Sequence, residues 1–372
     1  MEARVYKSGE EEAIVELLDV VFRGWPKYDL TGDAVDFWCW KYQDSPTPSM
    51  VLVIEEEGKL VSSYHSWRQK VWVQGKTWVF ESGMDFTVHP EYRRRGLSLK
   101  ISQLAREIGQ KEKIPVNNTV TEQPIILHGH NKNEAVHLFP KKLVNMARIN
   151  DISEQLRVMP VKNGWIINIG YRTLDILNSA VNMFKPKPNI GKITTRLVTA
   201  FPESINDYWN IIKIDLDYSL EISQEYLNWR YCDSRIGGYQ VHVAEENGQP
   251  VGYVVTRINK KYPEYPIGYI VELSYLPNRT EIGYKLLETA LPYLCDVNVV
   301  NFLTIENHPD IELLKMFGYH NSRINIHSYY ENYIPPDPLE PLNNSHPNKI
   351  HLSWGDYDIL PVKMPKKSET IS

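Results

Sequence analysis

Asp85-Phe86-Thr87-Val88-His89-Pro90-Glu91-Tyr92-Arg93-Arg94-Arg95-Gly96-Leu97-Ser98 is the most informative stretch of this sequence. The residues from Met84 to Val88 predict a strand, and the apolar spacing from Leu97 to Lys111 predicts a helix that begins directly after Gly96. A strand, a tight turn and a helix in this order leave unpaired amides at the first helical turn, with the positive end of the helix dipole behind them. The stretch therefore predicts an anion-binding turn.

The residue types in the turn suit a phosphate group. Gly96 allows a close approach of the backbone to a ligand, because a side chain there would take the space of the phosphate. Ser98 is small and carries a hydroxyl donor, while Arg93, Arg94 and Arg95 add positive charge. An exposed basic turn without a ligand is the alternative, but the position between a strand and a helix favours a phosphate site. The patterns GxxxxGK[ST] and GxGxxG are absent.

Length and composition restrict the class of protein. A chain of 372 residues predicts two domains, and a formal charge of −5 argues against broad electrostatic binding of nucleic acid. Three widely spaced cysteines without partner motifs predict reduced thiols, no metal and a cytoplasmic location. The charged N-terminus does not predict a signal peptide, and no stretch approaches the roughly 18 apolar residues of a membrane span.

Two halves of the sequence match each other. Phe37 to Ser45 (FWCWKYQDS) matches Tyr226 to Ser234 (YLNWRYCDS), and Glu57 to Val61 matches Asn247 to Val251. The strand before Pro277, Ile270 to Tyr275, corresponds to the strand that ends before Pro90. Chance similarity of aromatic segments is the alternative, but agreement in order and spacing at three places predicts an internal duplication.

The pattern of apolar, Gly and Pro residues predicts the elements of each copy. In the first copy, helices are expected at residues 11–24, 33–42 and 97–111, with strands at 51–54, 60–67, 71–73, 78–80, 84–88 and 116–121. Residues 171–184 are expected to form a connecting helix, residues 206–214 to open the second copy, and residues 351–358 to supply its last strand.

Arg93-Arg94-Arg95-Gly96-Leu97-Ser98 resembles motif A of the GCN5-related N-acetyltransferase (GNAT) superfamily, [RQ]-x-x-G-x-[GA], with Ser98 at the last position. Pro277 to Tyr284 resembles a degenerate second version, which keeps one Arg and one Gly but places Glu281 where it would repel a phosphate. The resemblance implies an α/β (mixed α+β) fold of two tandem GNAT-like domains, each a twisted, mostly antiparallel sheet flanked by helices. The domains are expected at 1–160 and 201–360, with a connecting helical segment at 161–200 and a flexible tail at 361–372.

The resemblance also implies a ligand, acetyl-CoA as acyl donor, bound by the first copy. The turn from Arg93 to Ser98, including Leu97, would hold the pyrophosphate. Backbone groups of Phe86, Thr87 and Val88 would pair with the pantetheine arm as if it were an added strand. A strand amide would donate to the thioester oxygen as the reaction proceeds.

A later segment departs from the family pattern. Asn133 to Phe139 resembles the superfamily's Asn followed by a helix that carries a Tyr, which implies cofactor contacts for Asn133 and Phe139. Phe139 stands where many members have a Tyr that protonates the leaving thiolate. Protonation would then come from water or another side chain, or would be dispensed with.

Attack by an amine on a thioester needs a neutral amine, and hence a base. The candidates are Glu122 after strand 116–121, Glu81 at the start of the strand before the turn, and Asp85 within that strand. His130, or His128 beside it, could act through water; a metal is not expected, since no third ligand accompanies them. Each carboxylate is also compatible with an ordinary surface or hairpin position.

The sequence thus predicts an N-acetyltransferase that moves acetyl from acetyl-CoA to a primary amine by direct attack in a ternary complex. The acceptor is an unidentified small molecule or peptide, and neither nucleic acid nor membrane is expected as a partner. A catalytically silent CoA-binding regulator is the alternative. An aminoacyl transferase is disfavoured, because an aminoacyl-tRNA donor does not present a pyrophosphate. The repeated aromatic helices, with Trp38, Trp40 and Trp229, could line an acceptor pocket or simply pack on the sheet.

Overall fold

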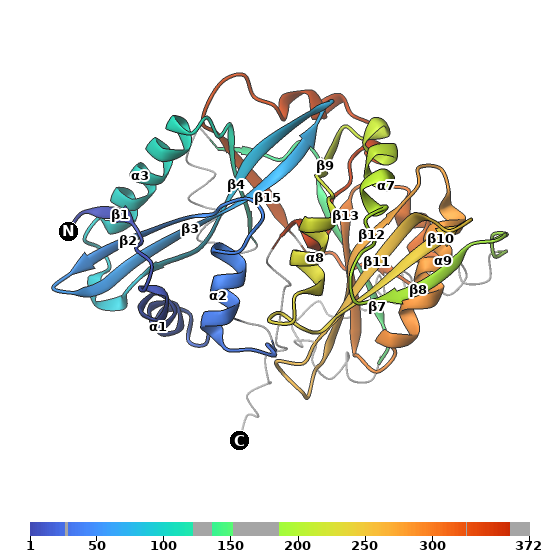
Figure 1. Cartoon of the computed structure of the whole chain (residues 1–372), viewed down its shortest axis with the longest axis horizontal. Helices are drawn as coiled ribbons and strands as arrows, with labels where there is room; N and C mark the ends of the chain where they lie inside the picture. Colours follow the sequence, from blue (N-terminus) through green and yellow to red (C-terminus); the bar gives the residue numbers. More distant parts are fainter. Residues whose placement is uncertain (27–28, 122–135, 152–185, 325, 358–372) are drawn as a thin grey trace, which may run out of the picture. The chain divides into compact units, whose positions relative to one another are not determined.

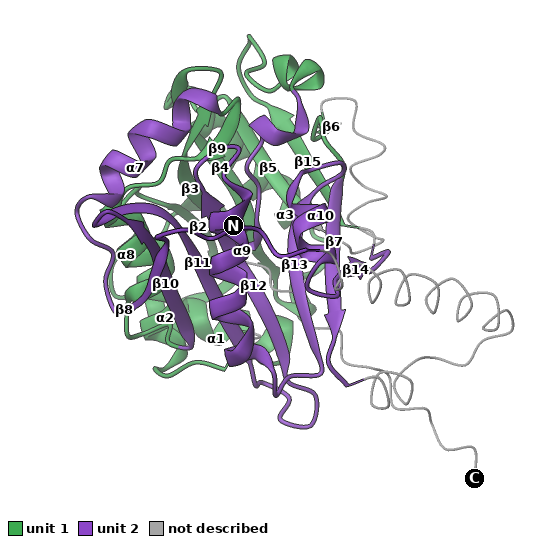
Figure 2. Ribbon diagram, turned by 90° about the vertical axis from the view of Figure 1, so that its right-hand side faces the viewer, with its two compact units in different colours: residues 1–142, 216–237, 326–345 green, residues 143–215, 238–325, 346–372 purple. Residues whose placement is uncertain are grey.

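The computed structural model describes residues 1–26, 29–121, 136–151, 186–324 and 326–357 (Figure 1). Contacts divide the chain into two compact units, coloured in Figure 2. Unit 1 comprises Met1–Lys142, Leu216–Gly237 and Ile326–Ser345, and unit 2 comprises Leu143–Asp215, Gly238–Asn325 and His346–Ser372. Each unit therefore takes segments from both halves of the sequence. The domains predicted at 1–160 and 201–360 are continuous in sequence, whereas these units are not. The predicted boundaries remain predictions.

Unit 1 is built on an eight-stranded sheet with the order β1-β2-β3-β4-β5-β15-β6, and β9 pairs separately with β3. The strands are β1 (Ala3–Val5), β2 (Met50–Glu56), β3 (Lys59–Val73), β4 (Lys76–Val88), β5 (Val116–Thr121), β6 (Val136–Leu138), β9 (Tyr218–Leu220) and β15 (His327–Asn332). The helices are α1 (Glu11–Phe22), α2 (Ala34–Tyr42), α3 (Leu97–Lys111) and α8 (Gln224–Cys232). All pairs are antiparallel except β4 and β5, which run parallel.

The predicted hairpins are present, with longer strands than expected. Glu57-Gly58 joins β2 to β3 with φ of 52° and 79°, and Gln74-Gly75 joins β3 to β4 with φ of 49° and 85°. Two consecutive positive φ values are typical of the two-residue turns that match the twist of paired strands. Strands expected separately at 60–67 and 71–73 merge into β3, and those at 78–80 and 84–88 merge into β4.

Helix α3 follows its predicted bounds and buries the predicted face. Leu97, Ile101 and Ala105 are almost fully buried and belong to one core cluster with strand residues Leu52 and Val61. Burying a Leu or Ile side chain contributes about 1.5–3 kcal/mol, so this face fixes the helix on the sheet. The position of the turn before α3 is fixed with it.

Unit 2 repeats the plan on a seven-stranded sheet with the order β14-β7-β13-β12-β11-β10-β8. The strands are β7 (Leu143–Ile149), β8 (Thr194–Val198), β10 (Tyr239–Glu246), β11 (Gln249–Asn259), β12 (Ile267–Tyr275), β13 (Val299–Ile305) and β14 (His320–Asn321). The helices are α7 (Ile205–Ile212), α9 (Thr280–Ala290) and α10 (Asp310–Lys315). Among the described strands of unit 2, only β12 and β13 pair in parallel. The predicted α/β class with mostly antiparallel sheets is confirmed.

Each sheet takes at least one strand from the other half of the sequence, and the sheet of unit 1 takes both β9 and β15. β15 comes from the C-terminal half but pairs with β5 and β6 of unit 1. β7 precedes the second copy in sequence but pairs with β13 and β14 of unit 2. The two strands hold equivalent places beside the parallel pair of each sheet, so neither half of the sequence completes its sheet alone. β8 lies in the stretch expected to be a helical connection and pairs with β10.

Two predicted elements are wrong. Residues 351–357 form no strand; Trp354–Asp356 is a 3-10 turn, because Ser353 and Asp356 cap its start reciprocally. The helix expected in Asn133–Phe139 is replaced, over its described part, by β6, which pairs with β15. The predicted connecting helix at 171–184 lies outside the described residues.

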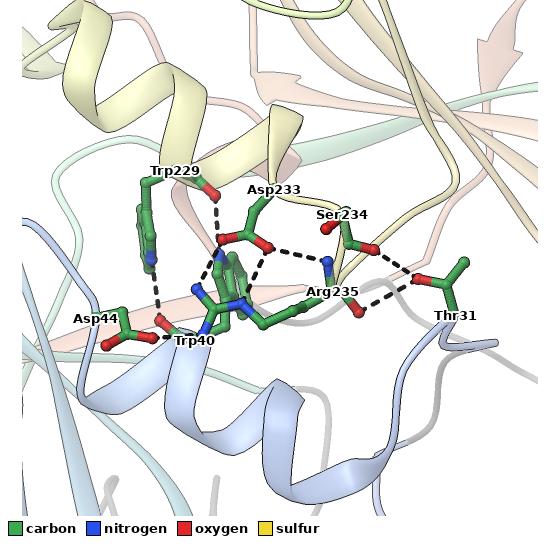
Figure 3. Close-up of polar contacts among 7 residues, drawn as sticks. All are labelled: Thr31, Trp40, Asp44, Trp229, Asp233, Ser234 and Arg235. Carbon is green, nitrogen blue, oxygen red and sulfur yellow. Dashed lines mark hydrogen bonds and ion pairs between the residues drawn. The ribbon is translucent and has the colours of Figure 1, made fainter.

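The repeated aromatic helices α2 and α8 contact each other within unit 1 (Figure 3). The ring N–H of Trp40 donates to the carbonyl of Trp229 (2.8 Å), and the ring N–H of Trp229 donates to the carbonyl of Trp40 (2.9 Å). The two rings stack with centroids 4.9 Å apart. Arg235 joins the same contact through ion pairs with Asp44 and Asp233. Both tryptophans are buried, so packing accounts for them and the acceptor-pocket alternative gains no support.

We expect Trp40→Phe and Trp229→Phe each to lower the free energy of unfolding by about 1–3 kcal/mol, because each leaves a buried carbonyl without its donor. Urea unfolding followed by circular dichroism measures this. Trp78→Phe is the matched control, since the half-buried Trp78 ring packs under Lys76 and its N–H makes no bond to a described residue. Equal effects of all three substitutions would contradict a role for the reciprocal bonds.

Candidate functional site

The parallel pairing between β4 and β5 ends early. Only Glu81 with Asn117 and Ser82 with Asn118 are paired, although β4 continues to Val88. On its other edge β4 stays paired with β3 as far as Val88. Residues 84–88 thus have one edge that pairs with no described strand, here called the open edge of β4. Such an edge can bind an extended ligand as an added strand.

A bulge at Asp85 shapes the open edge. The register between β3 and β4 shifts opposite Tyr64, and Asp85 has φ +46°. Its carboxylate accepts hydrogen bonds from Lys41 Nζ (2.7 Å), Tyr42 OH (2.5 Å) and Trp25 Nε1 (3.1 Å). A left-handed conformation costs a non-glycine residue of order 1 kcal/mol, and these three bonds offset it.

The charge state of Asp85 follows from the same contacts. Burial works against ionisation, but Lys41 and the other donors hold the pKa of Asp85 below its usual range. Lys41 is itself only 1% exposed and lies over the Tyr42 ring. A carboxylate held by a buried ammonium is a weak base, so the pair favours a positioning role for Asp85 over the base considered from sequence.

His65 supports the bulge from β3. Its Nε2 accepts from Trp38 Nε1 (2.9 Å), which leaves Nδ1 to donate to the carbonyl of Asp85 (3.2 Å). The side chain is fully buried, and burial lowers the pKa of His65 to about 4. Sequence reasoning missed this histidine. The only signal for the surrounding cluster is Lys41, a charged residue inside an aromatic helix.

The turn before α3 has the expected geometry for an anion. Arg94 and Gly96 both have positive φ, 64° and 75°, and Gly96 precedes the first residue of the helix. A Cβ built on Gly96 meets no atom within 4 Å, so space is open beside the backbone. No side chain caps the helix start and no acidic residue lies in its first turn. The first-turn amides and the exposed Ser98 hydroxyl are thus free of protein caps.

The three arginines of the turn differ in their contacts. Arg95 lies over the Tyr92 ring and 3.8 Å from Glu56, and Arg93 Nε donates weakly to the carbonyl of Val88 (3.4 Å). Arg94 is exposed and bonds to no described residue. Arg94 is therefore the arginine of this turn that is most available to a ligand phosphate.

The predicted pantetheine-binding residues lie on the open edge of β4. Thr87 turns its side chain towards β3, with Oγ1 2.7 Å from Ser63 Oγ. Phe86 is 38% exposed and packs edge-on against Tyr64. Phe86, Thr87 and Val88 therefore form one continuous backbone that ends at the anion turn.

Phe139 has its described contacts away from the anion turn. Its amide donates to the carbonyl of Ser328 (2.8 Å), and its buried ring packs edge-on against Tyr218. These partners belong to β15 and β9, and none belongs to the anion turn. The cofactor contact implied for Phe139 is not supported by its surroundings.

Glu81 is, besides Asp85, the predicted base that the structure describes. Its Oε1 accepts from Arg68 Nε (3.0 Å) and Nη2 (2.9 Å), and Arg68 also pairs with Glu112. Its Oε2 is buried and has no partner among the described residues. Burial raises the pKa of Glu81 despite Arg68, as expected for a carboxylate that can exchange a proton. Glu122, His128, His130 and Asn133 lie outside the described residues.

The second copy has lost the anion turn. Arg279 takes the position before α9, and its guanidinium pairs with Glu281 and with Glu246. A Cβ on Gly283 would lie 2.6 Å from the Tyr275 ring, so this glycine serves close packing rather than a ligand. The carboxylates neutralise the arginine and would repel a phosphate.

Two family descriptions match the two copies. Residues 2–118 match "Acetyltransferase (GNAT) domain" and residues 205–319 match "Acetyltransferase (GNAT) family", and together they span more than half of the chain. The chain belongs to the GNAT family. It is a tandem GNAT protein, and its fold is an acyl-CoA-binding acyltransferase fold. By sequence, no curated protein matches significantly.

Solved structures share the fold at low identity. A probable N-acyltransferase from Enterococcus faecalis has a TM-score of 0.58 at 12% identity, covering 89% of this chain and 72% of that chain. A GCN5-related N-acetyltransferase from Anabaena variabilis has 0.58 at 9%, covering 90% and 73%. Saccharomyces cerevisiae N-myristoyltransferase with bound myristoyl-CoA has 0.55 at 12%, covering 91% and 84%. At these identities the similarity concerns the fold alone.

The described part of the GNAT chain contains neither a membrane-spanning helix nor a metal-binding cluster. Within the described ranges, no helix is long and apolar enough to cross a membrane. Within the same ranges, no group of three or more His, Cys, Asp or Glu residues could hold a metal ion.

The buried neutral His65 predicts a pH dependence of stability. Its pKa is about 4 in the folded protein against an ordinary value of 6.5. The neutral ring therefore adds its full share to the free energy of unfolding above pH 6.5, and this share is lost as the pH falls towards 4. The loss is about 3 kcal/mol. His65→Gln keeps an acceptor for Trp38 and should remove this part of the pH slope in urea unfolding. His346→Gln, at an exposed position, should retain the native slope; a native slope in His65→Gln would contradict the assignment.

Proposed function

We propose that this protein is an acyl-CoA-dependent N-acyltransferase that moves acetyl from acetyl-CoA to a primary amine. The observation that carries the proposal is the continuity between the anion turn at Arg93–Ser98 and the open edge of β4. A ligand with a pyrophosphate at one end and an extended amide-containing arm fits both features at once. Unit 1 would hold the donor. The second copy would not, because carboxylates neutralise the arginine of its turn.

The residues of unit 1 suit specific parts of the donor. The first-turn amides of α3 and Ser98 would bind the pyrophosphate, with Arg94 adding charge. Backbone groups of residues 86–88 would pair with the amides of the arm. The bulge held by Asp85 would direct a backbone amide at the thioester oxygen, where negative charge develops.

The chemistry requires one bond to form and one to break. The amine nitrogen attacks the thioester carbon, the C–N bond forms, the C–S bond breaks, and the electron pair leaves on sulfur. The amine must lose a proton, and Glu81, whose pKa is raised by burial, is the described residue that best suits this role, acting through water that reaches its buried carboxylate. Glu122 and His130 remain alternative bases.

A silent CoA-binding protein is the second candidate. The position of Phe139, which provides no hydroxyl and packs against Tyr218, favours it. Thiol release in the presence of a panel of primary amines separates the two: turnover supports the transferase, and tight CoA binding without turnover supports the regulator.

Acetyl-CoA at about 100 times its dissociation constant should stabilise the protein by about 2.7 kcal/mol and raise the melting temperature by about 3–4 °C. Gly96→Glu should abolish the rise, because it places a negative side chain in the open space beside the turn.

Gly75→Glu is the matched control. Gly75 also has a positive φ, 85°, and open space around a Cβ, but it lies at the other end of β4. Both variants should melt at lower temperature than the native protein, and only Gly96→Glu should lose the response to acetyl-CoA. A response retained in Gly96→Glu, or absent from the native protein at millimolar ligand, would overturn the site assignment.

A further inference from the structure

A side chain of β5 occupies the point where β4 and β5 separate. Asn117 Oδ1 accepts from the amide of Gly83 (3.1 Å), directly after the last residue of β4 that pairs with β5. Asn117 Nδ2 donates to Tyr333 OH (2.7 Å) and, at longer range, to Tyr64 OH (3.3 Å). Asn117, Tyr64 and Tyr333 together form what we call the Asn117 clamp.

The clamp is held firmly by its surroundings. Tyr64 and Tyr333 are each only 7% exposed, and the Tyr333 amide donates to the carbonyl of Pro115 (2.7 Å). A Cβ on Gly109 of α3 would lie 2.8 Å from the Tyr333 ring, so the helix packs directly on that ring. Tyr64 OH would lie 2.9 Å from a Cβ on Gly83. Deeper entry along β4 would require these packed groups to move.

The distance from the anion turn to the clamp matches the donor. From Val88 to Gly83 the strand advances five residues, at most about 16 Å at 3.3 Å per residue because the bulge at Asp85 shortens the stretch. This is comparable with an extended pantetheine arm. A donor whose pyrophosphate sits at Gly96 would therefore bring its sulfur and acyl carbonyl to residues 83–85, next to the clamp.

We infer that the Asn117 clamp closes the inner end of the acyl site and restricts the donor to short acyl chains such as acetyl and propionyl. The inference rests on the proposed function. A longer chain has to displace Asn117 and Tyr64, which costs buried hydrogen bonds, or to leave the strand edge. The fold itself imposes no such limit, since a structure of the same fold holds myristoyl-CoA. The limit lies in these side chains.

Calorimetric titration of the full chain with CoA, acetyl-CoA and octanoyl-CoA tests the inference without knowledge of the acceptor. The native protein should bind octanoyl-CoA at least about tenfold more weakly than acetyl-CoA. Asn117→Ala, which opens the inner end, should reduce this ratio to about threefold or less by strengthening octanoyl-CoA binding, with CoA itself little changed.

Two further variants keep the test decisive. Asn118→Ala is the control, because Asn118 bonds to Ser82 rather than to the Gly83 amide and should keep the native ratio. Gly83→Ala adds a methyl group against Tyr64 and Asn117, so it should weaken acetyl-CoA relative to CoA. This variant carries the test if Asn117→Ala fails to fold.

The outcomes separate the inference from the function on which it rests. Equal affinity of the native protein for acetyl-CoA and octanoyl-CoA would overturn the clamp while leaving the donor site intact. A selectivity that survives Asn117→Ala, or an unchanged affinity of Gly83→Ala for acetyl-CoA relative to CoA, would assign chain length to other residues. No binding of any CoA compound by the native protein would instead sink the proposed function.

Discussion

The candidate site depends on one constraint, the failure of β4 and β5 to stay paired beyond Ser82 and Asn118. Two parallel strands that separate inside a sheet leave backbone donors and acceptors exposed, which is costly unless something satisfies them. On one side the side chain of Asn117 takes over the Gly83 amide, and on the other the bulge at Asp85 turns the chain with help from Lys41. The remaining open edge leads directly to the turn at Gly96. Anion turn and strand edge are thus two ends of one feature.

The candidate site depends on both halves of the sequence, because strands from each half take part in the sheet of the other. β15 lies beside β5 and continues to Tyr333, which completes the Asn117 clamp. In unit 2, β7 fills the same place beside β13. The reciprocal bonds between Trp40 and Trp229 join equivalent positions of the two copies, as in a symmetric dimer, although one chain supplies both. The duplication is therefore visible in contacts as well as in sequence.

The two copies differ in the turn before the helix that follows the bulged strand, and they agree in the carboxylate beside the bulge. Each copy has a carboxylate beside a bulge, in β4 of unit 1 and in β12 of unit 2. In unit 1, Asp85 pairs with Lys41; in unit 2, Glu272 pairs with His351, where burial opposes the charge but Glu272 raises the pKa of the histidine to about 9. The turns that follow these two strands differ in their surroundings. Gly96 opens onto free space, whereas Arg279 is neutralised by its own neighbours. The bulged strand and its carboxylate are present in both copies, whereas the open turn is present only in the first.

The sequence by itself determined the local elements, because their signals are local. Apolar spacing defined α3, Glu57-Gly58 and Gln74-Gly75 defined the hairpins, and Gly96 at a helix start defined the anion turn. It also determined the duplication and the family. It failed at Val136–Leu138 and at residues 351–357, where long-range pairing or capping overrode the local pattern. Only the tertiary structure decided that His65 is neutral, that Lys41 meets Asp85, and that Tyr333 reaches Asn117 from 216 positions away. These contacts depend on which strands become neighbours in the sheet, and no local pattern of residues specifies that.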